Sequence, residues 1–242
     1  MCFSRSVRLG MILALLTVLV STASGHYLWV SVDDKSGDKG TVNVYFEEGA
    51  APGDGTYLDP FVKGGKTWIR TIANPKPELI AMKETSQAKF RWLTAPAPAA
   101  APRSIDSYGK FGVYRYGTTD VLLHYYARNV QVDSHDDLHE LSRAENLDLD
   151  IVPHEVGGKM ELTILWKGKP AVDRVVNVRG PEKFLENPKT DKEGRVLFAI
   201  KDPGKYVFRT NVEENIAGKD GDKEYSLIRH HATLIITLPL KK

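Results

Sequence analysis

Apolar and polar residues alternate along much of this chain of 242 residues. In residues 26–32 (HYLWVSV) every second position from Leu28 is Leu or Val, and residues 41–48 (TVNVYFEE) repeat the pattern up to Phe46. Glu48 follows, either as an inward carboxylate or as the exposed end of the strand. A period of two is typical of half-buried strands. Further stretches rich in aromatic and β-branched residues predict more strands: KTWIRTI, AKFRWL, KFGVYRYG and TDVLLHYYARNV.

The second half of the chain shows shorter predicted strands that are separated by tight turns. From about Pro153 the turn signals are KGKP, TDKEG and DPGK. About seven short strands, with turn signals roughly every 8 to 12 residues, fit a β-sandwich. No alternation of strands with helices is present, so a parallel sheet is not expected. The sequence therefore predicts an all-β fold with two antiparallel β-sandwich domains of the immunoglobulin or transthyretin-like kind, over residues 26–152 and 153–242.

One short helix is expected between the two halves, in the segment DSHDDLHELSRAENL. Ser134 is the expected N-cap, with Asp137 three residues later as a weakened capping box. Leu138 supplies part of a narrow apolar face. His135 and His139 share one face of this helix, but the spacing HDDLH lacks the glutamate base of a zinc protease. A solvated acidic helix is the favoured interpretation.

The first 25 residues have the features of a secretory signal peptide. Arg5 and Arg8 precede a run of apolar residues at 9–20 (LGMILALLTVLV), and the small residues STASG follow. A membrane-spanning helix needs about 20 apolar residues, so this run fits a signal sequence, with an uncleaved anchor as the alternative. We expect an exported protein, periplasmic or secreted from a bacterial envelope, with no membrane contact after cleavage.

The composition narrows the class of protein further. Cys2 is the only cysteine and lies in the expected signal peptide, so the mature chain has no disulfide and relies on its core. The net charge of the whole chain is +2, and removal of Arg5 and Arg8 leaves it formally neutral, which argues against a nucleic-acid partner. The sequence has no Gly-x-Ser-x-Gly, phosphate-loop or dinucleotide motif, so we expect a non-catalytic protein.

Two cleavage positions place His26 at or near the new amino terminus. Cleavage after Gly25 makes His26 the first residue, so that its α-amino group and a ring nitrogen can chelate one ion. A second histidine across a sheet then completes a three-nitrogen site that suits Cu(II). Cleavage after Ala23 leaves Ser24 first, and an amine, two amide nitrogens and the imidazole form a square-planar set for Cu(II) or Ni(II). The alternative is that His26 only begins a strand.

Two further histidines are candidate metal ligands. His230 lies on the last predicted strand, on the face of its apolar residues, and His124 shares a face with Leu122 and Tyr126. A buried histidine bonded to a main-chain carbonyl gives the same pattern. The candidate ligand set is therefore His26, His230 and His124, with Cu(II) or Ni(II)/Co(II) as the ion.

Two groups of motifs resemble known families. The segments LTILWKGKPAVDRVVNV, TDKEGRVLFAI and PGKYVFRT resemble the carboxypeptidase-regulatory or transthyretin-like sandwich. The opening GHYLWV and the closing EYSLIRHHATL are similar to a bacterial exported family, a domain of unknown function described as resembling a periplasmic component of nickel or cobalt uptake. The second resemblance covers nearly all of residues 26–240. It implies export, a sandwich fold, a role with metal, and a partner in an envelope transporter.

These observations support three hypotheses about function. The first is a non-catalytic exported protein that binds a divalent transition metal ion (nickel, cobalt or copper) as a carrier or sensor. The second is an envelope interaction module that binds protein or polysaccharide, in which the histidines are structural. The third is a copper enzyme that uses the His26 chelate for oxidative chemistry.

Overall fold

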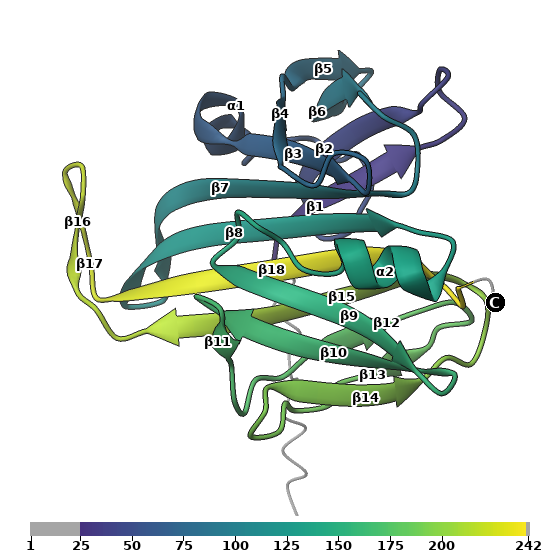
Figure 1. Ribbon diagram of the computed structural model, residues 1–242. Coiled ribbons are helices and arrows are strands. Elements are labelled where there is room, and N and C mark those ends of the chain that lie inside the picture. The colour runs from purple at the N-terminus through teal and green to yellow at the C-terminus, as the bar shows by residue number, and fades with distance from the viewer. Residues whose placement is uncertain (1–24, 241–242) are drawn as a thin grey trace, which may run out of the picture.

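The computed structural model describes residues 25–240, and strands make up most of this range. The all-β class predicted from the sequence is confirmed. The sheets stack in three layers (Figure 1), which we call the upper, central and lower sheets. The expected signal peptide, residues 1–25, lies outside the described residues except for Gly25. No helix among the described residues is long and apolar enough to cross a membrane.

The upper sheet has the strand order β1-β2-β6-β5, and its pairings are antiparallel. Leu28 and Val30 on β1 and Val44 and Phe46 on β2 point toward the central sheet and form a core with it, as the alternation predicts. The strands are β1 (Tyr27–Asp33), β2 (Thr41–Glu47), β5 (Lys83–Gln87) and β6 (Phe90–Pro96).

The central sheet contains strands from both halves of the chain, in the order β13-β12-β15-β18-β8-β7-β3-β4. Strands β8 and β18 pair in parallel, which differs from the fully antiparallel expectation. Parallel neighbours need a long crossover, and the whole lower sheet lies in the connection between these two. The strands are β3 (Lys66–Thr71), β4 (Glu78–Ile80), β7 (Arg103–Tyr116), β8 (Thr119–Gln131), β12 (Asn177–Arg179), β13 (Leu185–Glu186), β15 (Gly204–Glu214) and β18 (Leu227–Leu238).

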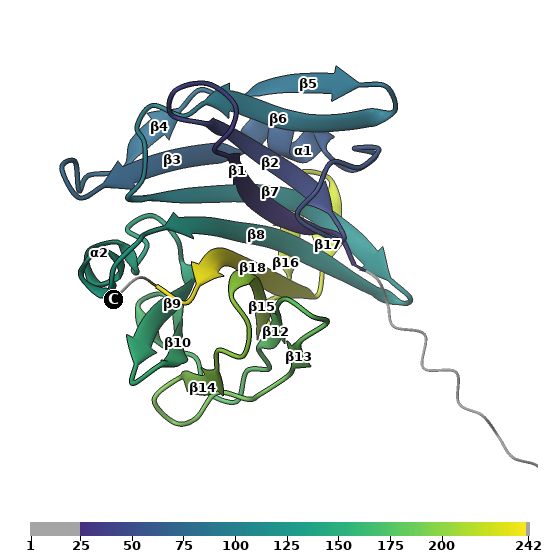
Figure 2. The ribbon, with the colours of Figure 1, turned by 90° about the vertical axis from the view of Figure 1, so that its right-hand side faces the viewer.

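The lower sheet packs on the other face of the central sheet (Figure 2) and encloses a second core with it. Its strands are β9 (Leu149–Val156), β10 (Lys159–Trp166), β11 (Lys169–Pro170) and β14 (Arg195–Ala199). The expected domain boundary between residues 152 and 153 falls inside β9, where Pro153 pairs with Leu162. Because β9 pairs only with β10, it is an edge strand, which is where a sheet tolerates proline.

Two helices and one hairpin complete the described part of the chain. Helix α2 (His135–Leu141) forms where the sequence predicts it, and the Ser134 hydroxyl accepts a hydrogen bond from the Asp137 N–H at 3.1 Å. Helix α1 (Asp59–Gly64) is not expected from the sequence, because it is short and its first turn, which contains Pro60, lies in a stretch full of turn signals. The hairpin of β16 (Gly218–Asp220) and β17 (Lys223–Tyr225) projects from the sheets at the left of Figure 1.

A buried charge cluster ties the central sheet to the lower sheet. Arg128 on β8 is 1% exposed, and its guanidinium donates to Asp106 on β7 and to Asp150 on β9, each at 2.9 Å. It also donates to the main-chain oxygens of Leu141 and Ser142 at the end of α2. The cluster therefore holds two strands, a helix and the start of β9 in one arrangement.

Candidate metal site at the start of β1

The corner where β1 begins and β2 ends contains the first candidate residue. His26 directly precedes β1, and its neighbour Tyr27 pairs with Glu47, the last residue of β2. The imidazole of His26 meets the ring of Tyr57 edge-on at a centroid distance of 5.2 Å and lies 5.8 Å from the ring of Phe46. The His26 side chain is 29% exposed, so the ring is held on two sides and is still accessible from solvent.

Glu47 is the carboxylate that faces this imidazole. Its Oε2 lies 3.7 Å from Nε2 of His26, while Oε1 accepts a hydrogen bond from the main-chain N–H of Gly55 at 3.1 Å. The carboxylate fills the space left by the missing side chain of Gly53, where a Cβ atom would lie 2.0 Å from the carboxyl carbon. The loop that contains these two glycines therefore fixes Glu47 and leaves one oxygen directed at His26.

A second carboxylate makes this corner more negative. Hydrogen bonds from the main chain and side chain of Thr56 lower the pKa of Asp54, and attraction to His26 lowers it further. Because Asp54 is exposed, its influence on the imidazole is screened by solvent. Two anionic groups near one imidazole favour a cationic ligand at this corner.

His124 and His230 form a stacked pair on the face of the central sheet that is covered by the lower sheet. They are partners in the parallel pairing of β8 with β18, and their ring centroids are 5.1 Å apart. The hydroxyls of Tyr108 and Tyr126 lie 2.8 Å and 3.1 Å from Nδ1 of His124 and His230, respectively. Nε2 of His230 lies 3.1 Å from Oε1 of Glu214. Three of the four ring nitrogens of the pair therefore have protein partners.

Burial keeps both imidazoles of this pair neutral. Burial, reinforced by the nearby His230 and Lys110, lowers the pKa of His124 to about 4. Burial also lowers the pKa of His230, although Glu214 opposes the shift through its hydrogen bond and its charge. Neutral, hydrogen-bonded and stacked rings have the properties of histidines that serve the packing of a core.

The three candidate ligands do not come together in one site. His124 and Tyr125 are consecutive on β8 and point to opposite faces of the sheet. Tyr125 contacts Phe46, which lies beside His26, whereas His124 stacks on His230. The central sheet therefore separates His26 from the other two. Within residues 25–240, no group of three or more His, Cys, Asp or Glu side chains is placed to hold a metal ion.

His231 lies on the same face of the central sheet as Tyr125 and is 9% exposed. Its ring stacks on Tyr125 at 5.0 Å and meets Tyr27 edge-on at 5.4 Å. Its Nδ1 has no hydrogen-bond partner in the part of the chain that the structure describes. Burial, followed by repulsion from Arg229, lowers the pKa of this imidazole to about 3. His231 is thus a neutral member of the aromatic packing between β1 and the central sheet.

An aromatic hollow of about 230 Å³ lies beside His26. Tyr57, Tyr114 and Tyr116 are 41%, 41% and 42% exposed, and Phe46 and Tyr125 are buried. No Asp, Glu, Lys or Arg side chain is among its lining residues. The lining consists of Gly25, His26, Phe46, Tyr57, Phe111, Tyr114, Tyr116, Leu123 and Tyr125. The hollow is therefore a place for a ring or an apolar group, next to the accessible imidazole of His26.

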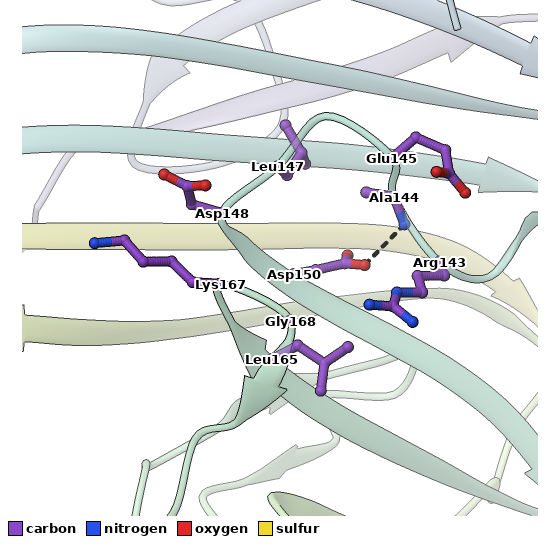
Figure 3. Close-up of a pocket in the computed structure, with 9 residues that line it drawn as sticks. All are labelled: Arg143, Ala144, Glu145, Leu147, Asp148, Asp150, Leu165, Lys167 and Gly168. Carbon is purple, nitrogen blue, oxygen red and sulfur yellow. Dashed lines mark hydrogen bonds between the residues drawn. The ribbon is translucent and has the colours of Figure 1, made fainter. Parts of the chain in front are cut away.

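A second hollow, of about 540 Å³, lies between the segment after α2 and the β10–β11 turn (Figure 3). Three of its charged side chains, those of Glu145, Asp150 and Lys167, already have ion-pair partners elsewhere in the fold. Asp150 bonds Arg128 and accepts from the main-chain N–H of Ala144 at 2.8 Å, and Lys167 bonds Glu214 at 3.1 Å. This hollow therefore has the character of a polar surface depression that is stabilised by its own ion pairs.

The fold and the site define an all-β protein of three stacked sheets, with one imidazole–carboxylate corner beside an aromatic hollow. No protein-family model and no curated protein matches the chain. Among solved structures, the chain is similar to a pullulanase from Anoxybacillus sp. LM18-11, alone and complexed with maltotriose, at 10% identity and a TM-score of 0.19. Each match covers 77% of this chain and 24% of that chain. A likeness this weak carries no argument about fold or function.

Sequence reasoning missed Glu47 and the hollow. Alternation along β2 points to Glu48 as the residue on the core face, but β2 ends at Glu47 and Glu48 is exposed. The signal for the hollow is the spacing of Tyr114 and Tyr116, which places two tyrosines on one face at the end of β7. Their proximity to His26 depends on how the upper sheet covers the central sheet, and no local pattern encodes that.

Proposed function

We propose that this is an exported, non-catalytic protein that binds a divalent transition metal ion, Cu(II) or Ni(II)/Co(II), at His26, as a carrier or sensor. The observation that supports the proposal is the carboxylate of Glu47 facing Nε2 of an accessible imidazole, at the expected amino terminus of the processed chain. The proposal keeps His26 from the candidate set and gives His124 and His230 a structural role, because their ring nitrogens are largely occupied.

The arrangement of the His26 ring suits chelation through its other nitrogen. A metal ion bound to the main-chain nitrogen of His26 and to Nδ1 closes a six-membered ring, whereas Nε2 lies on the far side of the imidazole. Both cleavage positions use Nδ1 in this way. Nε2 then carries the proton and faces Glu47. A ligating imidazole commonly donates its second N–H to a carboxylate, which fixes the tautomer and orients the ring.

The charges at this corner favour a cation over an anion. Glu47 and Asp54 both act on His26. Within the described range, no group of three or more His, Cys, Asp or Glu side chains is placed to hold a metal ion, so the main-chain nitrogen that processing exposes is a necessary part of the proposed site. Metal binding therefore requires the mature chain, and the unprocessed chain lacks the chelating amine.

One observation favours the alternative, an envelope module that binds protein or polysaccharide. Tyr57, Tyr114 and Tyr116 each leave about two fifths of their surface exposed around one hollow, and exposed aromatic groups gathered in this way mark binding surfaces. Such binding needs no metal ion. Binding of a partner that is unchanged by a chelator would support this alternative against the metal proposal.

Isothermal titration calorimetry of the processed chain with Ni(II) and Cu(II) tests the proposal. We expect His26→Ala to remove high-affinity binding and Glu47→Gln to weaken it by about 10- to 100-fold. The glutamine oxygen can still accept from Gly55, but its amide group presents a donor to Nε2 and so favours the wrong tautomer. Glu48→Gln, a change at the exposed neighbour, is the matched control and should bind like wild type. Binding that survives His26→Ala unchanged would overturn the proposal.

A further inference from the structure

An ion held at His26 keeps open coordination positions when the chain begins at that residue. The α-amino group and Nδ1 supply two nitrogens, and the described residues place no group of three His, Cys, Asp or Glu side chains together. Cu(II) and Ni(II) favour four or more donors. The remaining donors must therefore come from water or from another molecule at the corner next to the aromatic hollow.

The hollow begins at His26 and extends away from it across aromatic side chains. Tyr57 touches the imidazole, and the ring contacts then continue from Tyr57 to Phe111 at 6.3 Å, to Tyr114 at 6.2 Å and to Tyr116 at 4.9 Å. The exposed faces of the three tyrosines form the rim. A flat molecule at this rim would lie on aromatic surface while one of its edges reaches the position of the ion.

The chemistry of the lining selects among possible occupants. Polyhydroxylated ligands are usually held by charged or amide side chains, and the lining contains none of these. An anionic group has no Lys or Arg to meet in the hollow, so its only attractive partner at this corner is the ion itself. Aromatic rings favour offset or edge-to-face contact with another ring.

We propose that this hollow binds the ring of a small aromatic chelator, a planar molecule with adjacent nitrogen or oxygen donors that complete the coordination of the ion at His26. The inference rests on the proposed metal function and adds the class of ligand that accompanies the ion. The protein then takes up the metal as a complex with its chelator, through imidazole and amine on one side and ring donors on the other.

Native mass spectrometry of the chain that begins at His26, loaded with Ni(II), tests this with three probes. Pyridine-2-carboxylate (picolinate) has a ring and chelating donors. Its isomer pyridine-3-carboxylate (nicotinate) has the same size and charge but cannot chelate, and glycinate chelates without a ring. We expect a ternary complex of protein, Ni(II) and picolinate, with picolinate bound at least about tenfold more tightly than nicotinate or glycinate.

Variants of the hollow separate ring contact from chelation. Tyr114→Leu should weaken picolinate by about 3- to 10-fold, the range of one aromatic contact, and should leave glycinate unchanged. Phe90→Leu removes an aromatic side chain of similar exposure, 38%, outside the hollow and should leave all three probes unchanged.

Each outcome decides between the two proposals. If Ni(II) binds but picolinate binds no better than glycinate, or strips the metal, the chelator inference is wrong and the metal proposal stands. If Ni(II) alone does not bind, the metal proposal fails. Equal binding of picolinate and nicotinate to the metal-free chain would then identify a ring pocket that is unrelated to metal.

Discussion

Acid should destabilise this protein through its buried neutral histidines, and His231 provides a direct test. Burial holds the pKa of His231 at about 3 in the folded state, whereas an imidazole in the unfolded chain titrates near about 6.5. Between these two pH values the unfolded chain binds a proton that the folded chain does not. The stability that the neutral His231 contributes to the folded state is therefore fully present above about pH 7 and decreases as the pH falls toward 3.

The magnitude follows from the pKa of the unfolded state. At pH 5, about 1.5 units below that value, protonation stabilises the unfolded chain by about 2 kcal/mol for each such histidine. The titratable groups that act on His231 are Arg229, His230 and Arg209, and all of them oppose its protonation. His124, with a pKa of about 4, adds a similar amount, so the two together cost about 4 kcal/mol at pH 5.

Urea denaturation at pH 8 and pH 5 measures this effect as a change in the free energy of unfolding. His231→Phe keeps a ring against Tyr125 and removes the titrating group. Between pH 8 and pH 5, the free energy of unfolding of this variant should therefore fall by about 2 kcal/mol less than that of wild type. His139→Gln, at an exposed position of α2, is the control and should keep the wild-type dependence. If wild type and His231→Phe lose the same free energy on acidification, the reasoning is refuted.

Two substitutions test the packing of the sheets. Gly194 has φ of +74°, and a Cβ atom there would lie 2.9 Å from a main-chain oxygen. Gly194→Val should therefore lower the free energy of unfolding in the same urea assay by about 2 kcal/mol or more. Gly64→Val, at a position where the space is open, is the control and should lower it by less than about 1 kcal/mol. Arg128→Met leaves Asp106 and Asp150 buried without their cation, and we expect the free energy of unfolding to fall by about 3 to 5 kcal/mol. A melting temperature within a degree or two of the wild-type value would contradict the role given to the cluster.

The local features of the fold could be predicted, and the long-range pairing could not. The alternation in β1 and β2 and the Ser134 cap of α2 depend on neighbours in the sequence, and the structure confirms them. The parallel pairing of β8 with β18 joins residues about a hundred positions apart. Its energetic basis is the burial of two cores on opposite faces of one sheet, which leaves no signature in either strand alone.

The candidate site shows the same division between local and long-range information. The inward direction of His230 follows from a period of two and is confirmed, since the residue is 5% exposed. A period of two does not say which layer covers that face, so the separation of His230 from His26 could not be predicted. Glu47 reaches its position because Gly53 and Gly55 fold back over the end of β2, an interaction that depends on the loop's conformation.

The central claim is that metal binding at His26 depends on the free amine that processing exposes, either on His26 itself or two residues earlier on Ser24. Titration of Cu(II) and Ni(II) into three forms of the chain tests it. One form begins at His26 and one begins at Ser24. The third is extended by five residues and has a proline directly before His26, so that the residue preceding the histidine has no main-chain N–H. We expect tight binding by the two processed forms and a loss of about a hundredfold or more in the extended form, or about 2.7 kcal/mol. Equal affinity of all three forms would contradict the claim.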